Sequence, residues 1–559
     1  MLRRQLTLLS VALVAALCLP PAAGAQSPSR LRIATPAVDG NLTPYTTDAN
    51  YPFMSLVYDT LTWRDRQGIA RPWLARSISR DASGRFVFVN LRPGVRWQDG
   101  ERLTANDVVF TYTFMARRPH GRFTPELQEI LDVTATRELQ VRFTLRRPSR
   151  GLEDQPFADV PILPRHLWAD LPLNRRAPPG LPVGTGPYRL TSYEPRRRYR
   201  LKANDDYFRG QPSVERIDVP VIRRQQSILD ELNRQRLDAA PVAIPPGTIP
   251  QRGPVARYSD ETSFIGTMLL FNVRRGPFDR RLARRAVAQA LNLKSIAANA
   301  TSVPGGVVAA DRGMLHPRSR WAGPPGLQRF NPEAARLAFV EQGIGAFRVA
   351  ASRNDPVRLE AGKRVVRALT RVGARARLVE LSPRALDRVL GRRDAPASFD
   401  AAVVSIPALA SYDPAYLRAV FGDTGTRSLN DGGYRSAAFN ALAERAVSAP
   451  TQRRRRSIGN AQLRLLARDL PAVPLLFGGG TILYRPRAYD GWVDVRGTGI
   501  LDKRSFLSGQ SQRADSPGAA VPDLIDPSSD DGISLVPFIV GVALLMLAGG
   551  IWKLRRSRA

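Results

Sequence analysis

The alternation of apolar and polar residues along the chain predicts a mixed α/β protein. Segments of strand length that alternate or run apolar occur at 31–38, 86–89, 139–143, 188–190, 199–201, 216–222 and 268–273. Apolar residues at helical spacing follow Thr104, recur at 228–232, and predict helices at 280–298, 332–339 and 358–372. Strands and helices are thus interspersed through the central part of the chain, as in an α/β fold.

The segment from 93 to 107 carries the signals of a turn that leads into a helix. Thr104 is followed three residues later by Asp107, and this spacing permits a capping box at a helix N-terminus. Gly94 and Gly100 lie in the preceding turn and suit backbone with positive φ. We expect a strand–turn–helix unit here, with Trp97 packing across it.

The amino-terminal residues predict a secretory signal peptide over 1–25. Two arginines precede an apolar run over 6–19, and the small-residue motif at 23–25 follows it. The run is short for a membrane span, although an uncleaved anchor or a lipoprotein leader ending at Cys18 are alternatives. With cleavage after Ala25 the mature chain has no cysteine, and therefore no disulfide.

The carboxyl-terminal residues predict a membrane anchor. Residues 533–552 contain no charged side chain, and a helix of twenty residues rises about 30 Å, the thickness of a bilayer core. The basic tail at 553–559 places the C-terminus in the cytoplasm by the positive-inside rule. A Ser-, Gly- and Pro-rich linker at 508–532 joins this transmembrane helix to a periplasmic or extracytoplasmic body.

The chain carries a formal charge of +34, which raises the question of a nucleic-acid or anionic-membrane partner. The tight basic runs are Arg196–Arg198 and Arg453–Arg456, and no zinc-finger or RNA-binding motif accompanies them. An exported body seldom meets nucleic acid. We therefore interpret the excess charge as solvated arginine spread over the surface and expect no nucleic-acid partner.

The sequence contains few of the motifs that indicate catalysis. It contains no phosphate-binding loop, no H-E-x-x-H and no G-x-S-x-G motif. Its three histidines, His120, His166 and His316, are far apart in the sequence. We expect neither a metal nor another cofactor, and we interpret the chain as a binding protein rather than an enzyme.

Two adjacent motifs carry a family resemblance. Residues 91–100 (LRPGVRWQDG) and 103–108 (LTANDV) resemble the signature of family 5 extracellular solute-binding proteins, the oligopeptide- and dipeptide-binding components of ABC importers. Further elements of that family follow in its order: GTGPY at 184–188, an N-x-x-Y-x-x-G-x-P stretch at 204–212, Phe271-Asn272, Asp413-Pro414 and Leu470 to Leu475. The resemblance spans roughly residues 31–500.

The resemblance implies a periplasmic-binding-protein-like fold with two lobes and an extra inserted region, three regions in all. A discontinuous first lobe would comprise 31–57, 184–270 and 481–507, the inserted region 58–183, and the second lobe 271–480. Ligand would be captured between the lobes by hinge closure. The implied partners are a peptide or related solute and the permease and ATPase subunits of an importer, with a monomeric body.

The resemblance also implies two ligand-lining segments. The candidate ligand-binding residues are Asp48, Asn50, Tyr51, Ser411, Tyr412 and Asp413. For the first three the alternative is a solvated loop, and for Asp413 it is turn chemistry before a proline.

One departure from the family bears on the ligand. Peptide-binding relatives usually carry a carboxylate shortly before the Asp413-Pro414 step, where it neutralises the peptide ammonium group. The matching residue here is Ala410, so a free peptide N-terminus would bind poorly unless Asp413 or Asp48 substitutes. A binder of a non-peptide anionic solute is therefore one alternative function. A membrane-anchored receptor uncoupled from transport is another, because the predicted C-terminal helix departs from the freely diffusing or lipid-anchored importers to which the chain is similar.

Overall fold

The computed structural model describes most of the central part of the chain. The described residues are 28–47, 49–118, 120, 122–123, 127–242, 256–259, 263–301, 306–327, 329–392, 396–423, 429–478 and 481–507. The predicted signal peptide, linker, transmembrane helix and tail lie outside these residues and stay predictions. Within the described part, no helix combines the length and hydrophobicity needed to cross a bilayer.

The first lobe comprises the described residues of 28–242 together with 256–259 and 481–507. Its strands form four sheets: β1–β10–β9–β8 (Arg30–Arg32, Arg216–Pro220, Arg198–Ala203, Tyr188–Glu194), β2–β3 (Thr62–Arg64, Ala70–Pro72), β4–β5–β7–β6 (Ala75–Arg80, Phe86–Leu91, Gln140–Leu145, Ile130–Arg137) and β11–β19–β12 (Ala239–Val242, Thr481–Tyr484, Ala256–Ser259). Its helices are α2 (Tyr51–Val57), α3 (Ala105–Arg117), α4 (Arg165–Trp168), α5 (Gln225–Asn233) and the 3-10 helix η3 (Lys503–Phe506). One large buried cluster, from Leu31 to Phe506, joins most of these elements.

The second lobe, residues 263–478, is built on one mixed six-stranded sheet. Its order is β14–β18–β13–β17–β15–β16 (Val307–Ala309, Ala472–Gly478, Gly266–Phe271, Ala401–Ile406, Phe347–Ser352, Ala376–Leu381). β13 lies antiparallel to both of its neighbours, and β15 lies parallel to β16 and β17. The predicted start of the second lobe, residue 271, is the last residue of β13.

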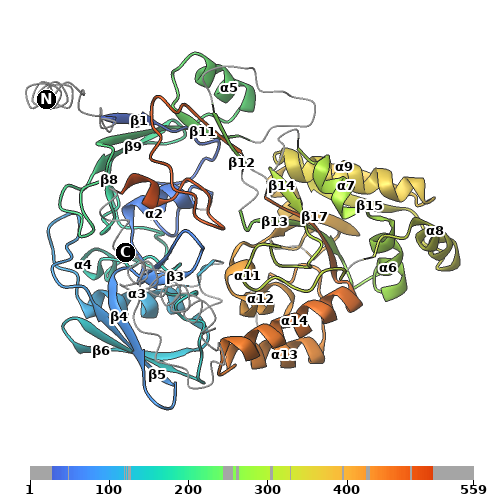
Figure 1. Ribbon diagram of the computed structural model, residues 1–559, viewed down its shortest axis with the longest axis horizontal. Helices are drawn as coiled ribbons and strands as arrows, with labels where there is room; N and C mark the ends of the chain where they lie inside the picture. Colours follow the sequence, from blue (N-terminus) through green and yellow to red (C-terminus); the bar gives the residue numbers. More distant parts are fainter. Residues whose placement is uncertain are drawn as a thin grey trace, which may run out of the picture. The chain divides into compact units, whose positions relative to one another are not determined.

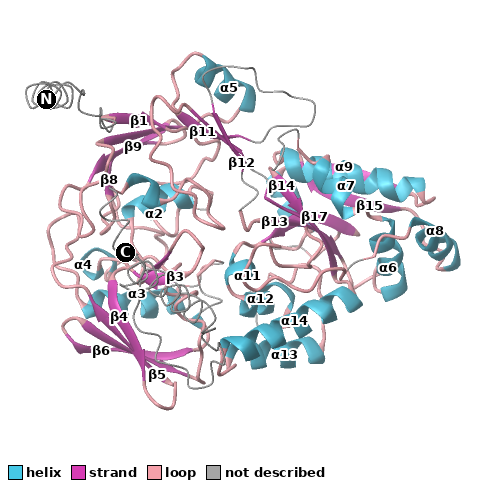
Figure 2. Cartoon of the chain, in the orientation of Figure 1, coloured by secondary structure: helices cyan, strands magenta, loops and turns pink. Residues whose placement is uncertain are grey.

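Helices cover both faces of this sheet. Alternate residues of each strand point to opposite sides, and apolar side chains on each side pack against one layer of helices. Leu269 and Phe271 pack into one buried cluster, and Met268 and Leu270 pack into the other. Figures 1 and 2 show α7 and α9 on one face and α13 and α14 on the other. The helices are α6 (Arg281–Ala290), α7 (Leu293–Ala298), α8 (Pro332–Glu341), α9 (Pro356–Arg371), α10 (Pro383–Val389), α11 (Leu409–Tyr412), η2 (Pro414–Tyr416), α12 (Leu417–Phe421), α13 (Ala437–Val447) and α14 (Gln452–Asp469).

The predicted strand–turn–helix unit is confirmed. Gly94 and Gly100 have φ of 76° and 98°. The main-chain N–H of Thr104 donates to Asp107 Oδ2 at 2.9 Å, at the start of α3. The second carboxylate oxygen of Asp107 accepts the N–H of Arg165 at 3.0 Å, so that the same side chain also fixes the start of α4.

The continuous helix predicted over 280–298 is wrong, because the chain breaks between α6 and α7. Leu291 and Asn292 are extended there. The Asn292 side chain accepts the N–H of Ser295 at 3.0 Å and caps a new helix. An Asn that competes with the main chain in this way favours a cap over a helix interior.

Gly184 and Gly186 serve a close approach of two chain segments. A Cβ on Gly184 would lie 1.9 Å from the carbonyl oxygen of Val57, and one on Gly186 would lie 2.3 Å from that of Leu56. The N–H of Gly186 donates to Val57 at 2.8 Å. These glycines therefore hold the start of β8 against α2, the helix that begins with the candidate residue Tyr51.

Candidate functional site

Tyr51 is positioned by a partly buried ion pair within the first lobe. Its hydroxyl donates to Asp159 Oδ1 at 3.2 Å, and the guanidinium of Arg122 lies 3.8 Å from the centre of its ring. Arg122 binds both oxygens of Asp159 through two nitrogens, at 2.7 and 3.0 Å. Burial raises the pKa of the Tyr51 phenol, and Asp159 adds to this. Tyr51 is thus a neutral hydrogen-bond donor held by a charged pair.

Asn50, the residue before Tyr51, is engaged with the chain itself. Its Oδ1 accepts the hydroxyl of Thr35 at 2.6 Å, and its Nδ2 donates to the carbonyl of Ala37 at 3.3 Å. The side chain is buried and ties the start of α2 to the segment after β1. Asp48 lies outside the described residues. Ligand contact by either residue stays a prediction.

Tyr412 contributes the matching aromatic group from the second lobe. The guanidinium of Arg64, at the end of β2, lies 3.7 Å from the centre of its ring, a cation–π contact that joins the two lobes. Both side chains are buried. Arg64 also donates to the carbonyls of Asp154 at 3.0 Å and Ala158 at 3.3 Å.

Tyr51 and Tyr412 belong to one electrostatic environment. Burial raises the pKa of each phenol, and the charges of Arg64, Arg122 and Asp159 act on both. The fold therefore brings together two candidate segments that are more than 350 residues apart in the sequence. We call Tyr51, Arg64, Arg122, Asp159 and Tyr412 the interlobe cluster.

Ser411 is held by a loop of its own lobe. Its hydroxyl accepts the main-chain N–H of His316 at 2.9 Å, and its carbonyl accepts the hydroxyl of Ser319 at 2.6 Å. The carbonyl of Tyr412 accepts the indole N–H of Trp321 at 2.8 Å. These bonds fix the short helix α11 and hence the ring of Tyr412 against the first lobe. Direct ligand contact by Ser411 stays a prediction.

Asp413 forms a buried ion pair with Arg455 of α14, and each side chain is 2% exposed. Its Oδ1 also accepts the N–H of Ala415 at 2.9 Å, which is the turn chemistry expected before Pro414. A carboxylate already bound by a guanidinium is poorly placed to neutralise a second cation. The prediction that charged residues in the run Arg453–Arg456 are solvated is wrong for Arg455, although its neighbours are exposed.

Further contacts cross between the lobes beside this ion pair. Asp154 of the first lobe pairs with Arg320 of the second, and Gln155 Nε2 donates to the carbonyl of Leu409 at 2.9 Å. Gly151 packs directly on the buried pair, since a Cβ there would lie 2.2 Å from Arg455 Nη2. The side of the second lobe that carries α11 thus contacts the first lobe through an ion pair, a hydrogen bond and a close packing contact.

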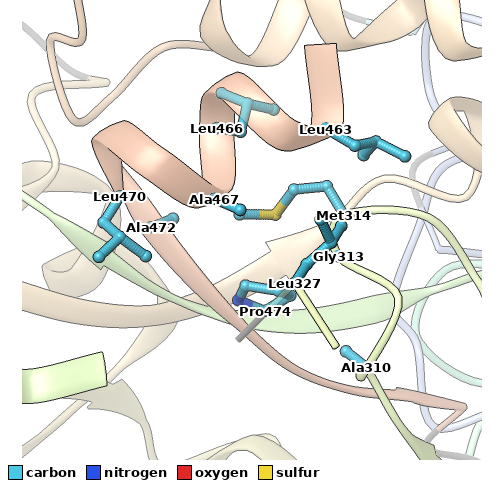
Figure 3. Close-up of a pocket in the computed structure, with 10 residues that line it drawn as sticks. All are labelled: Ala310, Gly313, Met314, Leu327, Leu463, Leu466, Ala467, Leu470, Ala472 and Pro474. Atoms are coloured by element: carbon cyan, nitrogen blue, oxygen red, sulfur yellow. The ribbon is translucent and has the colours of Figure 1, made fainter. Parts of the chain in front are cut away.

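A separate pocket lies inside the second lobe, between α14 and the segment 310–327 (Figure 3). Its lining is apolar: Ala310, Gly313, Met314, Leu327, Leu463, Leu466, Ala467, Leu470, Ala472 and Pro474. It offers no polar side chain to orient a peptide and includes none of the candidate residues. Among the described residues, no group of three or more His, Cys, Asp or Glu side chains is arranged to hold a metal ion.

The arginines and aspartates of the interlobe region were missed by the sequence analysis. Arg64, Arg122 and Asp159 follow no motif, and their partners are distant in sequence. A signal did exist for Arg455, because it shares the spacing of a buried helix face with Ile458, Gly459 and Gln462.

The two-lobed α/β fold is the one that the sequence resemblance to solute-binding proteins implies. The model of the bacterial extracellular solute-binding proteins, family 5, matches residues 70–428, more than half of the chain. The chain belongs to this family.

Individual relatives agree with that assignment. The oligopeptide-binding protein AppA of Bacillus subtilis is 29% identical over 186 residues, which cover 32% of this chain and 34% of AppA. The dipeptide-binding protein of Escherichia coli is 27% identical over 311 residues, 50% of this chain and 55% of that protein. In both cases the match spans less than two thirds of the relative's length.

The structural similarity covers more of the chain than these sequence matches do. The solved structure of AppA from Bacillus subtilis, in complex with a nonapeptide, superposes with a TM-score of 0.71 at 20% identity. The superposition covers 87% of this chain and 99% of that one. The predicted periplasmic-binding-protein-like fold is thereby confirmed.

Proposed function

We propose that this chain is the extracytoplasmic capture subunit of an ABC importer for peptides or peptide-like solutes. Support comes from the family match and from relatives named for binding oligopeptides and dipeptides. In this proposal the chain carries out no catalysis. It delivers its ligand to permease and ATPase subunits, and the predicted helix at 533–552 anchors it to the membrane.

The observation that carries the proposal is the contact of Tyr412 with Arg64 across the lobes, together with the charges of Arg64 and Arg122 that act on the phenols of both Tyr51 and Tyr412. Two aromatic rings, each covered by a guanidinium, approach from opposite lobes and would enclose a ligand when the lobes close. Guanidinium N–H groups suit main-chain carbonyls. The two tyrosine hydroxyls donate to Asp159 and to the carbonyl of Arg496 and are free to accept main-chain N–H groups, which every peptide presents regardless of its side chains. We include Asp48, Asn50, Ser411 and Asp413 in the proposed site as residues that lie beside this pair in the sequence.

Native mass spectrometry of the full-length protein, purified in mild detergent, tests the binding step. We expect peptides to co-purify with the protein and to be released on unfolding. Uptake of those peptides by cells should stop when the gene is deleted. Peptide binding without any loss of uptake would favour a receptor that is uncoupled from transport, and the absence of bound peptide would contradict the proposal.

Two conservative variants test the proposed site. Tyr51→Phe and Tyr412→Phe each remove one hydroxyl and keep the ring that packs under an arginine. If the hydroxyls contact ligand, each variant should weaken peptide binding by about threefold to tenfold, the range for one neutral hydrogen bond. Tyr193→Phe, which removes a hydroxyl bonded to the carbonyl of Asp39 outside the interlobe cluster, should leave binding unchanged.

A further inference from the structure

The carboxylates around the interlobe cluster are already matched by cations. Asp159 is bound by Arg122, Asp154 by Arg320 and Asp413 by Arg455. Deeper in the first lobe, Asp59 binds Lys503 at 2.6 Å, with both side chains fully buried. Each of these aspartates therefore has its charge balanced within the protein.

One further carboxylate, Asp502, acts on the pKa of Tyr412, and it is occupied by hydrogen bonds. It accepts from the indole N–H of Trp63 at 3.2 Å, from the main-chain N–H of Arg504 at 2.9 Å and from the hydroxyl of Thr498 at 3.3 Å. The carboxylates described around the cluster are thus each engaged within the protein, four by a cation and Asp502 by hydrogen bonds.

Arg64 differs from Arg122, Arg320 and Arg455, which each pair with an aspartate. It is 4% exposed, and no carboxylate of the described residues lies within ion-pair distance of it. Its acceptors are two neutral carbonyls, and its face is covered by the ring of Tyr412. A buried guanidinium without an anion is costly.

We propose that the ligand presents a carboxylate to Arg64 and no free ammonium group to the interlobe cluster. This inference rests on the proposed function and names its substrate class: acidic peptides, or peptides whose amino end is blocked and whose carboxyl end is free. The carboxylate binds Arg64 through charge-assisted hydrogen bonds, while the ring of Tyr412 covers the guanidinium from the second lobe. A ligand ammonium group would meet Arg64 as a like charge instead.

A degenerate pool of tetrapeptides, synthesised in four versions, tests this on the full-length protein. The amino end is free or acetylated, and the carboxyl end is free or amidated. Retention of each version is measured by native mass spectrometry. We expect amidation to lower retention by about tenfold or more, because it removes a charge-assisted hydrogen bond. Acetylation should leave retention unchanged or raise it, because it removes the ammonium charge that Arg64 would repel.

Variants locate the effect at Arg64. In Arg64→Gln the acid and amide pools should be retained equally, whereas Arg285→Gln, which changes an exposed arginine of α6, should keep the acid preference. The comparison of acid and amide pools on the unchanged protein does not depend on whether Arg64→Gln folds. Equal retention of the two pools by the unchanged protein, or loss of binding on acetylation, would overturn this inference but leave peptide capture standing. Failure to retain any pool would overturn both.

Discussion

At the residue scale, burial determines how much an ion pair contributes to the stability of the fold. Asp413 and Arg455 are each 2% exposed, whereas Asp423 and Arg435, 3.7 Å apart on the same lobe, are 48% and 82% exposed. Breaking a buried pair leaves an uncompensated charge and costs about 3–5 kcal/mol, while an exposed pair contributes about 0–1 kcal/mol.

Asp413→Asn should therefore lower the free energy of unfolding by about 3–5 kcal/mol, and Asp423→Asn should leave it within about 1 kcal/mol of the unchanged protein. Urea unfolding of the full-length protein measures both. Equal effects of the two substitutions would show that burial of Asp413 does not determine its contribution.

A second prediction at this scale concerns the tight contact at Gly184. Gly184→Ala would place a Cβ 1.9 Å from the carbonyl of Val57, whereas a Cβ on Gly345 would meet no atom within 4 Å. The first substitution forces two backbone segments apart and should destabilise the protein by about 1–3 kcal/mol or more, as overpacking does. Gly345→Ala is the matched control and should be close to neutral in the same thermal unfolding assay.

At the scale of elements, local patterns predicted the first lobe better than the second. The strands at 86–89, 139–143, 188–190 and 199–201 alternate or run apolar and are confirmed as parts of β5, β7, β8 and β9. β18 was missed because it is buried along its whole length and contains Pro474, which cannot donate to a ladder. The ladder between β13 and β18 shifts register at Met268, the residue opposite that proline. A segment without alternation that contains a proline does not by itself predict a strand.

The residues of the candidate site also divide into those that the sequence predicted and those that it did not. Tyr51 and Tyr412 were reached through short motifs that resemble a family, and the structure places them in one cluster. Arg64 and Arg122 could not be reached, because their relevance depends on which distant residues the fold brings beside them. Their own neighbours in the sequence carry no pattern that distinguishes them from the many exposed arginines.

An element-scale prediction concerns Asp107, which holds the starts of two helices. It accepts the N–H of Thr104 at 2.9 Å and that of Arg165 at 3.0 Å. Asp107→Ala leaves both donors without this partner and should lower the free energy of unfolding by about 1–3 kcal/mol. Glu101→Ala, at an exposed residue just before the same helix, should change it by less than about 0.5 kcal/mol. Chemical denaturation measures both.

At the scale of the whole folded body, a ring of four charges joins the lobes away from the interlobe cluster. Glu129 of the first lobe accepts from Arg418 of α12 and from Arg147, each at 2.8 Å. Arg147 in turn pairs with Glu444 of α13, and Arg418 lies 3.5 Å from Glu444. Burial raises the pKa of Glu129, but hydrogen bonds and charge from both arginines outweigh burial and lower the pKa overall.

This ring predicts a dependence of the lobe contact on pH. A carboxylate whose folded pKa is depressed contributes stability that is present above its unfolded pKa, about 4.3, and is lost as pH falls through the folded value. Hydrogen exchange of amides in β6 and α12 should therefore accelerate as pH falls below about 4, after correction for intrinsic rates. Glu129→Gln should abolish this additional acceleration, and Glu138→Gln, an exposed residue of the β6–β7 turn, should retain it.

The small sheet β11–β19–β12 has a consequence for how such proteins can diversify. The chain leaves the first lobe after β12 and returns to it at β19, and these two strands are hydrogen-bonded neighbours in antiparallel register from Ala256–Tyr484 to Ser259–Thr481. The two chain connections between the lobes therefore start from adjacent strands of the first lobe. Exchange of genetic material at just those two points would graft a foreign second lobe onto an unchanged host. Recombination between relatives could in this way supply a new half of the binding surface in one event, while the first lobe stays as it is.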